Sequence, residues 1–299
     1  MRVVIVTGEP LGSYHLRPLY EEMSRSEAEF WHLLPYPEST QGEPYINTTA
    51  DITILNEARR MIVIGGGFSS WTRGMADYAE RRGIEVYLTE LAYGSCEPID
   101  GRVSLSKISA MSRSGAEVLS GYLGVNVEEI RITGNPLSEK LGSYKPEIGR
   151  ALVLSTVEFE RRDPSRLIKG VVEFLKSEGL EVVVRPHPRE SLSLWFGEEM
   201  DRNPYPEEAS RAEYIIGYPG TVFPVLSVLG AKVISLVPNK EMETCLPINL
   251  HSSLGVKVEN IKEFREVYRR VGPMEIRDLD YLVGPYKSAS SNIIDFWSK

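Results

Sequence analysis

Short apolar runs alternate with longer stretches of helical periodicity along almost the whole of this chain. The runs Val3–Val6 (VVIV) and Met61–Ile64 (MIVI) are apolar at every position, which is typical of parallel strands covered by helices on both faces. A repeated strand-then-helix alternation predicts βαβ units and a mostly parallel sheet. The pattern stops at Gly134-Asn135-Pro136 and then starts again, so the sequence predicts two α/β halves.

In the first half we expect strands over Arg2–Thr7, Glu29–Leu33, Met61–Ile64 and Glu85–Leu88, and another near Arg131–Thr133. The expected helices of this half are His15–Ser26, Trp71–Arg82 and Ser114–Leu123. The segment Leu34–Asn47 is rich in Pro, Gly and polar residues, which predicts a loop.

In the second half we expect strands over Ala151–Ser155, Glu181–Arg185, Tyr214–Ile216 and Lys232–Leu236. The expected helices are Ser165–Ser177, Val222–Leu229, Ile261–Val271 and Ser288–Trp297. The segment Leu137–Arg150 contains Gly142, Pro146 and Gly149, and these helix and strand breakers predict an interdomain linker.

The 299 residues suit two domains better than one. We therefore predict two Rossmann-like α/β domains whose parallel sheets face each other across a cleft. The first domain is expected over residues 1–140 and the second over residues 150–284. A C-terminal helix, residues 285–299, is expected to pack back on the first domain.

Charge and cysteine content exclude several classes of protein. A formal net charge of −8 argues against general nucleic-acid binding, which needs a basic surface. The cysteines Cys96 and Cys245 lie far apart without CxxC spacing, so we expect neither a disulfide framework nor a zinc site. No apolar run approaches the roughly 18 residues that a membrane helix needs, which predicts a cytoplasmic protein.

Ligands of open parallel sheets bind beyond the carboxyl ends of the strands, and two loops of the first half lie there. The loop after the first strand contains Gly12 and His15. A histidine at this point can act as a general base, or it can simply begin the helix. The loop after the third strand contains Gly66 and Gly67, whose backbone can hold polar groups of an acceptor or only bring the helix close to the sheet.

Two loops of the second half are candidate phosphate sites. Arg185 and His187 flank Pro186 at the end of a strand, where a cation beside an imidazole suits a phosphate or diphosphate. Gly220 permits close backbone approach, and Thr221 can cap the next helix, whose amino end attracts anions. Alternatively, the segment with Arg185 and His187 is only a charged surface loop, and the segment with Gly220 and Thr221 is only an ordinary strand-to-helix turn.

Taken in order, these segments resemble the inverting GT-B glycosyltransferases, most of all the N-acetylglucosaminyltransferase of lipid II synthesis. SYHLRPLYEEM resembles the glycine-rich turn with His-x-x-Pro, and GGGFSSWTRGMADYAERRGIEVYLTEL resembles the next block of that family. RITGNPLSEKL, with Gly134 and Asn135, is similar to its Thr-Gly-Asn-Pro hinge. AEYIIGYPGTVFPVLSVLGAKVISLVP resembles its nucleotide-binding block, with Asn249 at the position of a late Asn. RPHP resembles the His-Pro motif of bacterial sialyltransferases and polyol-phosphate transferases, whose donors are cytidine nucleotides.

The resemblance implies a metal-independent transfer of sugar from a nucleotide-sugar to a hydroxyl acceptor, in polysaccharide or glycoconjugate biosynthesis. His15 would activate the acceptor hydroxyl, and Glu90 would orient the base or the acceptor unless it only caps the next helix. The turn at Gly220 and Thr221 would bind the donor diphosphate. The nucleotide-sugar is a substrate and no further cofactor is expected. A lipid-linked or polysaccharide acceptor stays open, the former implying peripheral contact with a membrane.

Two departures from that family bear on the donor. Val225 stands where the family has a ribose-binding Glu, and Ser155-Thr156-Val157 replaces its Gly-Gly-Ser phosphate loop, leaving Ser155 as the phosphate contact. Two alternative functions therefore remain: a nucleotide-sugar epimerase or hydrolase of the same fold, and a non-catalytic nucleotide-sugar-binding or assembly subunit. No G-x-G-x-x-G follows the first strand, which disfavours an NAD-dependent dehydrogenase.

Overall fold

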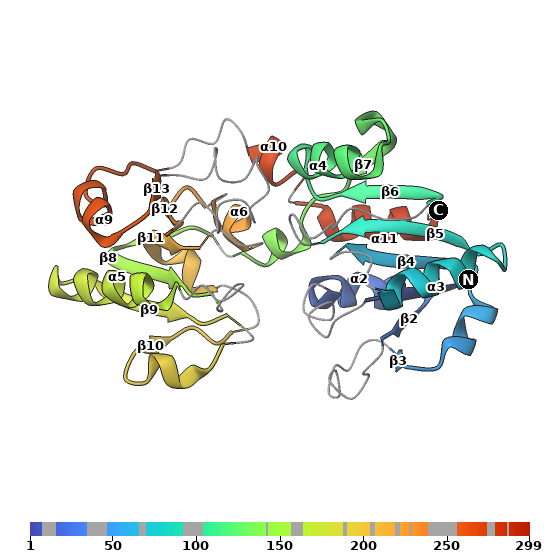
Figure 1. The fold of residues 1–299 in the computed structure, drawn as a ribbon, viewed down its shortest axis with the longest axis horizontal. Coiled ribbons are helices and arrows are strands. Elements are labelled where there is room, and N and C mark those ends of the chain that lie inside the picture. Colours follow the sequence, from blue (N-terminus) through green and yellow to red (C-terminus); the bar gives the residue numbers. More distant parts are fainter. Residues whose placement is uncertain are drawn as a thin grey trace. The chain divides into compact units, whose positions relative to one another are not determined.

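The chain forms two compact units, each a parallel β-sheet with helices (Figure 1). The first unit consists of Met1–Glu139 and Asp280–Lys299, and the second of Lys140–Leu279. This computed structural model describes residues 1–7, 16–34, 47–65, 70–91, 104–141, 143–156, 164–187, 190–203, 207–218, 222–227, 229–238, 256–273, 279–285 and 287–299.

The sheet of the first unit has seven strands in the order β3-β2-β1-β4-β5-β6-β7, and each neighbouring pair is parallel. The strands are β1 Arg2–Val6, β2 Glu29–Leu33, β3 Asn47–Thr49, β4 Arg60–Gly65, β5 Glu85–Glu90, β6 Lys107–Ala110 and β7 Ile130–Ile132. Its helical segments include η1 Arg17–Leu19, α2 Tyr20–Arg25, η3 Ile52–Glu57, α3 Ser70–Glu80, α4 Arg113–Leu123, η4 Val127–Glu129 and α11 Ala289–Ser298.

Successive side chains of a strand point to opposite faces of the sheet, and apolar clusters cover both faces of this one. Val4 and Val6 face the cluster that contains α3 and α4. Val3 and Ile5 face the cluster that contains α2 and α11. The run VVIV is therefore apolar throughout for the reason expected, namely that each of its residues lies in a core.

The last helix, α11, belongs to the first unit although the whole second unit precedes it in the sequence. Trp297 is fully buried, and its indole Nε1 donates a 2.8 Å hydrogen bond to Thr89 Oγ1 on β5. The buried Arg60 of β4 donates to the backbone oxygens of Trp297 (3.0 Å) and Lys299 (2.6 Å). The end of α11 is thus fixed by apolar packing and by a cation on its last carbonyls.

The sheet of the second unit has six strands in the order β10-β9-β8-β11-β12-β13, again parallel throughout. The strands are β8 Glu147–Leu154, β9 Glu181–Arg185, β10 Glu199–Met200, β11 Ala212–Gly217, β12 Lys232–Leu236 and β13 Val256–Val258. Its helical segments include α5 Ser165–Ser177, η6 Leu192–Trp195, η7 Glu207–Ser210, α6 Val222–Ser227 and α9 Ile261–Val267. Side chains of α5 and α9 pack with the sheet in one apolar cluster.

Two glycines of the first unit allow close backbone contact near the places where the chain leaves it and returns. Gly134 has φ +92°, and a Cβ built there would lie 2.4 Å from the backbone oxygen of Pro285. Gly284 has φ +70°, and its Cβ would lie 2.2 Å from the backbone oxygen of Met111. Any other residue would meet both backbone strain and a clash at either position. Next to Gly134, the buried Asn135 accepts a 3.0 Å bond from the Leu137 amide at the start of η5 (Pro136–Lys140).

Some elements differ from those expected from the sequence. The strands β3, β6, β10 and β13 were not predicted, since they have two to four residues and no long apolar run. The residues 147–150, expected in a linker, form the start of β8. The first expected helix is a 3₁₀ turn, η1, followed by the short α2. Within η1 Pro18 lacks an amide hydrogen, which suits the first turn of a helix.

Candidate functional site

Glu90 is the last residue of β5, at the carboxyl edge of the first sheet, where ligands of parallel sheets bind. The residue is only 2% exposed, and its Oε2 accepts a 3.1 Å hydrogen bond from the Met111 amide just before α4. Among the residues that the structure describes, Glu90 forms no ion pair. The side chain is thus a carboxyl group removed from water, and none of the described residues balances it with a positive charge.

Burial raises the pKa of Glu90 from 4.5 to about 7, and the Met111 hydrogen bond offsets part of this increase. A carboxyl group with a pKa near 7 is present in both protonation states at neutral pH. It can therefore accept and return a proton under the conditions in which most enzymes work. The side-chain cap of α4 (Arg113–Leu123) is Ser112, whose Oγ accepts from the Gly115 amide, and Glu90 accepts from Met111, which precedes this cap.

A second buried titratable group of the same edge was not predicted. His32 of β2 is fully buried, and its Nε2 lies 2.7 Å from Oγ1 of Thr7, the residue that follows β1. Burial lowers the pKa of His32 to about 4, so the imidazole is neutral at pH 7. In the described part of the chain its Nδ1 has no hydrogen-bond partner. The sequence signal was a histidine inside the strand run EFWHL.

Arg185, a predicted phosphate ligand, ends β9 at the carboxyl edge of the second sheet. Its Nη1 donates to Oδ2 of Asp201 (2.8 Å) and to the backbone oxygen of Asn203 (3.0 Å). The side chain of Asp201 is fully buried and that of Arg185 is 12% exposed. The guanidinium is thus held in place by a buried carboxylate, which already compensates its positive charge.

Two other predicted phosphate ligands, Ser155 after β8 and His187 after β9, are joined by Glu190. Glu190 Oε1 accepts from Ser155 Oγ (2.7 Å), and its Oε2 accepts from the His187 amide (3.1 Å). The backbone amide of Ser155 donates to the oxygen of Arg185 at 3.0 Å. The structure therefore brings Ser155, Arg185 and His187 together, and Glu190 and Asp201 are the residues that sequence reasoning missed.

Several predicted site residues lie outside the described residues: Gly12, His15, Gly66, Gly67, Gly220, Thr221 and Asn249. Their roles stay predictions. Val225, which stands where the resembling family has a ribose-binding Glu, is fully buried in α6. An apolar side chain in the core offers no polar contact to a ribose.

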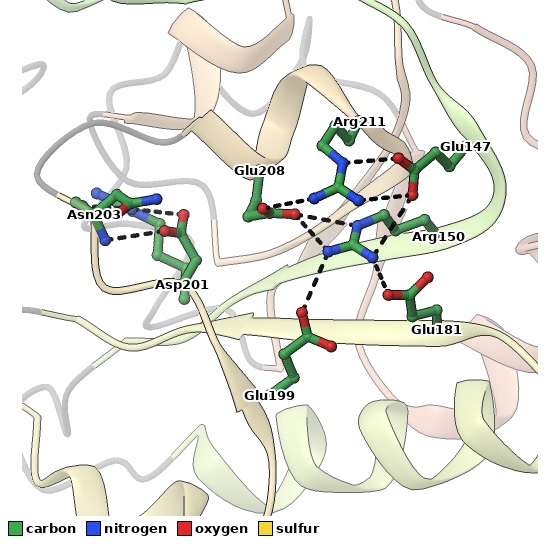
Figure 2. Close-up of polar contacts among 9 residues, drawn as sticks. Glu147, Arg150, Glu181, Glu199, Asp201, Asn203, Glu208 and Arg211 are labelled. Atoms are coloured by element: carbon green, nitrogen blue, oxygen red, sulfur yellow. Dashed lines mark hydrogen bonds and ion pairs between the residues drawn. The ribbon is translucent and has the colours of Figure 1, made fainter.

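The densest ion-pair cluster lies at the opposite, amino edge of the second sheet. Arg150, whose side chain is 4% exposed, pairs with carboxylates near the starts of three strands and in η7, and Figure 2 shows it surrounded by Glu147, Glu181, Glu199 and Glu208. Glu147 and Glu208 also pair with Arg211. Since ligands of parallel sheets bind at the carboxyl edge, we assign this cluster to the framework.

The described ranges contain neither a candidate metal site nor a candidate membrane span. No group of three or more His, Cys, Asp or Glu residues could hold a metal ion there. None of the helices in the same ranges has both the length and the apolar character needed to cross a bilayer.

Comparison with known proteins identifies the fold. No protein-family model matches the chain, and no curated protein matches it by sequence. A UDP-GlcNAc 2-epimerase from Neisseria meningitidis, bound to UDP-GlcNAc, has 13% identity, a TM-score of 0.60 and 99% of each chain covered. A variant of the wall teichoic acid polymerase TagF soaked with CDPG has 12% identity and a TM-score of 0.63, covering 99% of this chain and 88% of that one. The chain has the GT-B fold.

A further UDP-N-acetylglucosamine 2-epimerase has 12% identity and a TM-score of 0.63, with 99% of this chain and 95% of that one covered. These matches confirm the GT-B architecture and the two Rossmann-like parallel sheets. The narrower resemblance to the lipid II transferase and the reading of RPHP as a donor motif stay predictions.

Proposed function

We propose that this protein is an enzyme that transfers a sugar from a nucleotide-sugar to a hydroxyl acceptor, with Glu90 exchanging a proton with the substrate. The observation that carries the proposal is the Glu90 carboxyl at the carboxyl edge of the first sheet, buried and with its pKa raised to about 7. The GT-B fold, shared with enzymes solved with UDP-GlcNAc or CDPG, supports the substrate class.

The proposed chemistry breaks the bond between the anomeric carbon and the donor diphosphate and forms a bond to the acceptor oxygen. The acceptor hydroxyl loses its proton as it attacks, and the ionised Glu90 accepts it. Burial makes this carboxylate more basic than one in water, which is the property that such a step needs. His15, the base predicted from sequence, lies outside the described residues, so the proposal rests on Glu90.

In the second unit, Arg185, His187 and Ser155 are proposed to face the donor phosphates. Their present partners are the carboxylates of Asp201 and Glu190. A diphosphate would compete with Glu190 for the Ser155 hydroxyl, so we expect Glu190 to release that hydroxyl when the donor binds.

The first test is binding of nucleotides and nucleotide-sugars, with UDP, CDP, CMP, GDP, dTDP, ADP, UDP-GlcNAc and NAD as probes in a thermal-shift screen. A ligand at a hundredfold excess over its Kd stabilises the folded protein by about 2.7 kcal/mol. A shift with one nucleotide class and none with NAD supports the donor assignment. If the whole panel leaves Tm unchanged, the proposed substrate class is wrong.

The second test uses Glu90→Gln, which keeps the size of the side chain but cannot accept a proton. We expect donor affinity to change less than threefold and turnover to fall about 100-fold or more. In the wild type, turnover should rise with pH through an apparent pKa near 7, since Glu90 must be ionised to accept the proton. Equal turnover in the wild type and the variant would remove Glu90 from the mechanism.

A second candidate, epimerisation of a nucleotide-sugar, is favoured by the end-to-end match to the Neisseria epimerase, which covers 99% of both chains. Inverting a carbon centre by removing and returning its proton exchanges that proton with solvent. We would therefore incubate the protein with UDP-GlcNAc in D₂O without any acceptor. Deuterium at the sugar carbon and a second sugar epimer would favour epimerisation, whereas an unchanged donor that reacts only with added acceptor favours transfer.

A further inference from the structure

The amino end of α4 contains a glycine where the helix meets Glu90. Ser112 caps this helix, and its Oγ accepts a 3.1 Å hydrogen bond from the Gly115 amide. A Cβ built on Gly115 would lie 2.1 Å from Oε2 of Glu90, 2.9 Å from its Cδ and 3.0 Å from its Oε1. The Glu90 carboxyl group therefore occupies the space in which the side chain of any other residue at 115 would begin.

The contact is specific to this position on the helix. Gly121 lies about 1.7 turns further along α4, and a Cβ built there meets nothing within 4 Å. Glycine is a weaker helix former than alanine at both positions. Of these two glycines, only Gly115 has a neighbouring group, the Glu90 carboxyl, in the space that a side chain would fill.

In the part of the chain that the structure describes, the Glu90 carboxyl lies against Gly115 and the Met111 amide, and no cation pairs with it. Met111 supplies its hydrogen bond, and the helix beside it contributes Ala116 and Leu119 to the core. The charged side chains at this end of α4 are Arg113 and Glu117, which pair with each other at 3.6 Å, and Arg113 also pairs with Glu128 at 2.8 Å. Among the described residues, burial raises the Glu90 pKa, the Met111 amide lowers it, and no charged group adds to these two causes.

We propose that Gly115 is a positioning residue, which holds the Glu90 carboxyl against the first turn of α4, out of water and within reach of the Met111 amide. A side chain at 115 would push the carboxyl toward solvent. The inference rests on the proposed function in one respect only, that Glu90 is the group whose proton is exchanged.

The first experiment is a double-mutant cycle followed by calorimetry. In the wild type, Gly115→Ala should lower Tm by roughly 4–8 °C, because the new Cβ and the Glu90 carboxyl compete for one space. In the Glu90→Ala background the space is empty, so Gly115→Ala should raise Tm through its better helix propensity. Gly121→Ala is the matched control and should raise Tm slightly in both backgrounds. If Gly115→Ala lowers Tm equally in both backgrounds, the proposal is wrong.

The second experiment measures the protonation of Glu90 directly, by the infrared band or the ¹³C resonance of its carboxyl group, with Glu90→Gln to assign the signal. In Gly115→Ala the Glu90 pKa should fall from about 7 toward 4.5, since the displaced carboxyl regains water. In Gly121→Ala it should not move. An unchanged Glu90 pKa in Gly115→Ala would overturn the positioning role.

Neither readout requires turnover, so the two proposals fail separately. If the cycle and the titration behave as expected but no nucleotide-sugar reacts, the proposed function is wrong and the positioning of Glu90 by Gly115 stands. If the enzyme is active and Gly115→Ala retains both its turnover and its Glu90 pKa, the positioning role is wrong and the proposed function stands.

Discussion

A buried arginine lies at the amino edge of both sheets, and its partners differ between the two units. In the first unit Arg60 begins β4 and donates to backbone oxygens of α11 and to Glu85 at the start of β5. In the second unit Arg150 of β8 pairs with glutamates near the starts of its neighbours (Figure 2). Both arginines tie the starts of parallel strands together, one largely through dipoles and the other entirely through charges.

The carboxyl edges differ more deeply. The first unit buries Glu90 and His32 there without an ion pair to either in the described residues, and burial shifts the pKa of each toward its neutral form. The second unit buries Asp201 with its cationic partner Arg185. A titratable group that is buried without an opposite charge favours its neutral form, so its pKa shifts and it can exchange a proton. A group that is buried beside an opposite charge keeps its own charge. This difference agrees with the proposed function, in which Glu90 of the first unit exchanges a proton and Arg185 of the second faces the donor phosphates.

The largest effect that would break this comparison is expected at Asp201. Replacing Asp201 by Asn removes the charge that compensates a largely buried Arg185, which should lower the free energy of unfolding by about 4 kcal/mol. Urea unfolding of the two proteins measures the difference. The control is Asp295→Asn, whose partner Arg131 is 44% exposed, and a loss below about 1 kcal/mol is expected there. Similar losses in the two variants would mean that Arg185 is not held by a buried charge.

The next effect is a pair of opposing pH dependences within the first unit. Glu90 has a folded pKa above its unfolded value, so its contribution to stability is complete below pH 4.5 and is lost as pH rises to about 7. The difference in the free energy of unfolding between Glu90→Gln and the wild type should therefore change by about 3 kcal/mol in favour of the variant between pH 4 and a pH above 7. Unfolding by urea between pH 4 and 8 tests this.

His32 acts in the opposite direction. Its folded pKa of about 4 lies below the unfolded 6.5, so its contribution is present above pH 6.5 and is lost as pH falls toward 4. The difference in the free energy of unfolding between His32→Gln and the wild type should change by about 3 kcal/mol in favour of the variant as the pH falls from 7 to 4. The Glu90 and His32 contributions to the pH dependence of the free energy of unfolding have opposite signs and nearly cancel in the wild type. Each variant removes one of them, so its free energy of unfolding should depend on pH more steeply than that of the wild type. Two variants with parallel pH profiles would contradict both assignments.

The smallest effect concerns the two arginines of the amino edges. Arg150→Met and Arg60→Met each remove a guanidinium and keep an apolar stem. The expected cost is about 2 kcal/mol, less than at Asp201, because the carboxylates left behind are 20–56% exposed to water. In Arg150→Met the glutamates around it would repel one another, so 1 M NaCl should recover part of the loss. In Arg60→Met most of the lost partners are backbone oxygens, and salt should recover less. Equal recovery in the two variants would show that the two edges are alike.

The long elements of both sheets could be predicted because their strands are buried on two faces. VVIV and MIVI have no polar position that would leave their assignment open, and the 13-residue α5 begins and ends where its periodicity predicts. Three of the four strands that were missed, Asn47–Thr49, Glu199–Met200 and Val256–Val258, lie at the ends of the sheets and are specified by backbone pairing with a neighbour. The fourth, Lys107–Ala110, lies between β5 and β7 and has only four residues. The sequence of one short strand says little about which other strand its backbone pairs with.

The candidate site was predicted only in part, for a related reason. Glu90, Arg185 and His187 stand at strand ends, which a strand pattern reveals directly. Asp201 lies after the two-residue β10, and its contact with Arg185 is created by the pairing of β9 and β10. The perturbed pKa of Glu90 depends on Gly115, which is 25 positions away in the sequence and has no signal of its own.

The division of the first unit into Met1–Glu139 and Asp280–Lys299 has a consequence for synthesis on the ribosome. Val3, Ile5 and Tyr87 lie in the core face that α11 covers, yet α11 is made only after all of Lys140–Leu279. At a synthesis rate of roughly 5–20 residues per second, this face of the sheet stays without α11 for on the order of ten seconds. The second unit is continuous and can fold during this interval, whereas the core of the first unit cannot be completed until α11 has been made.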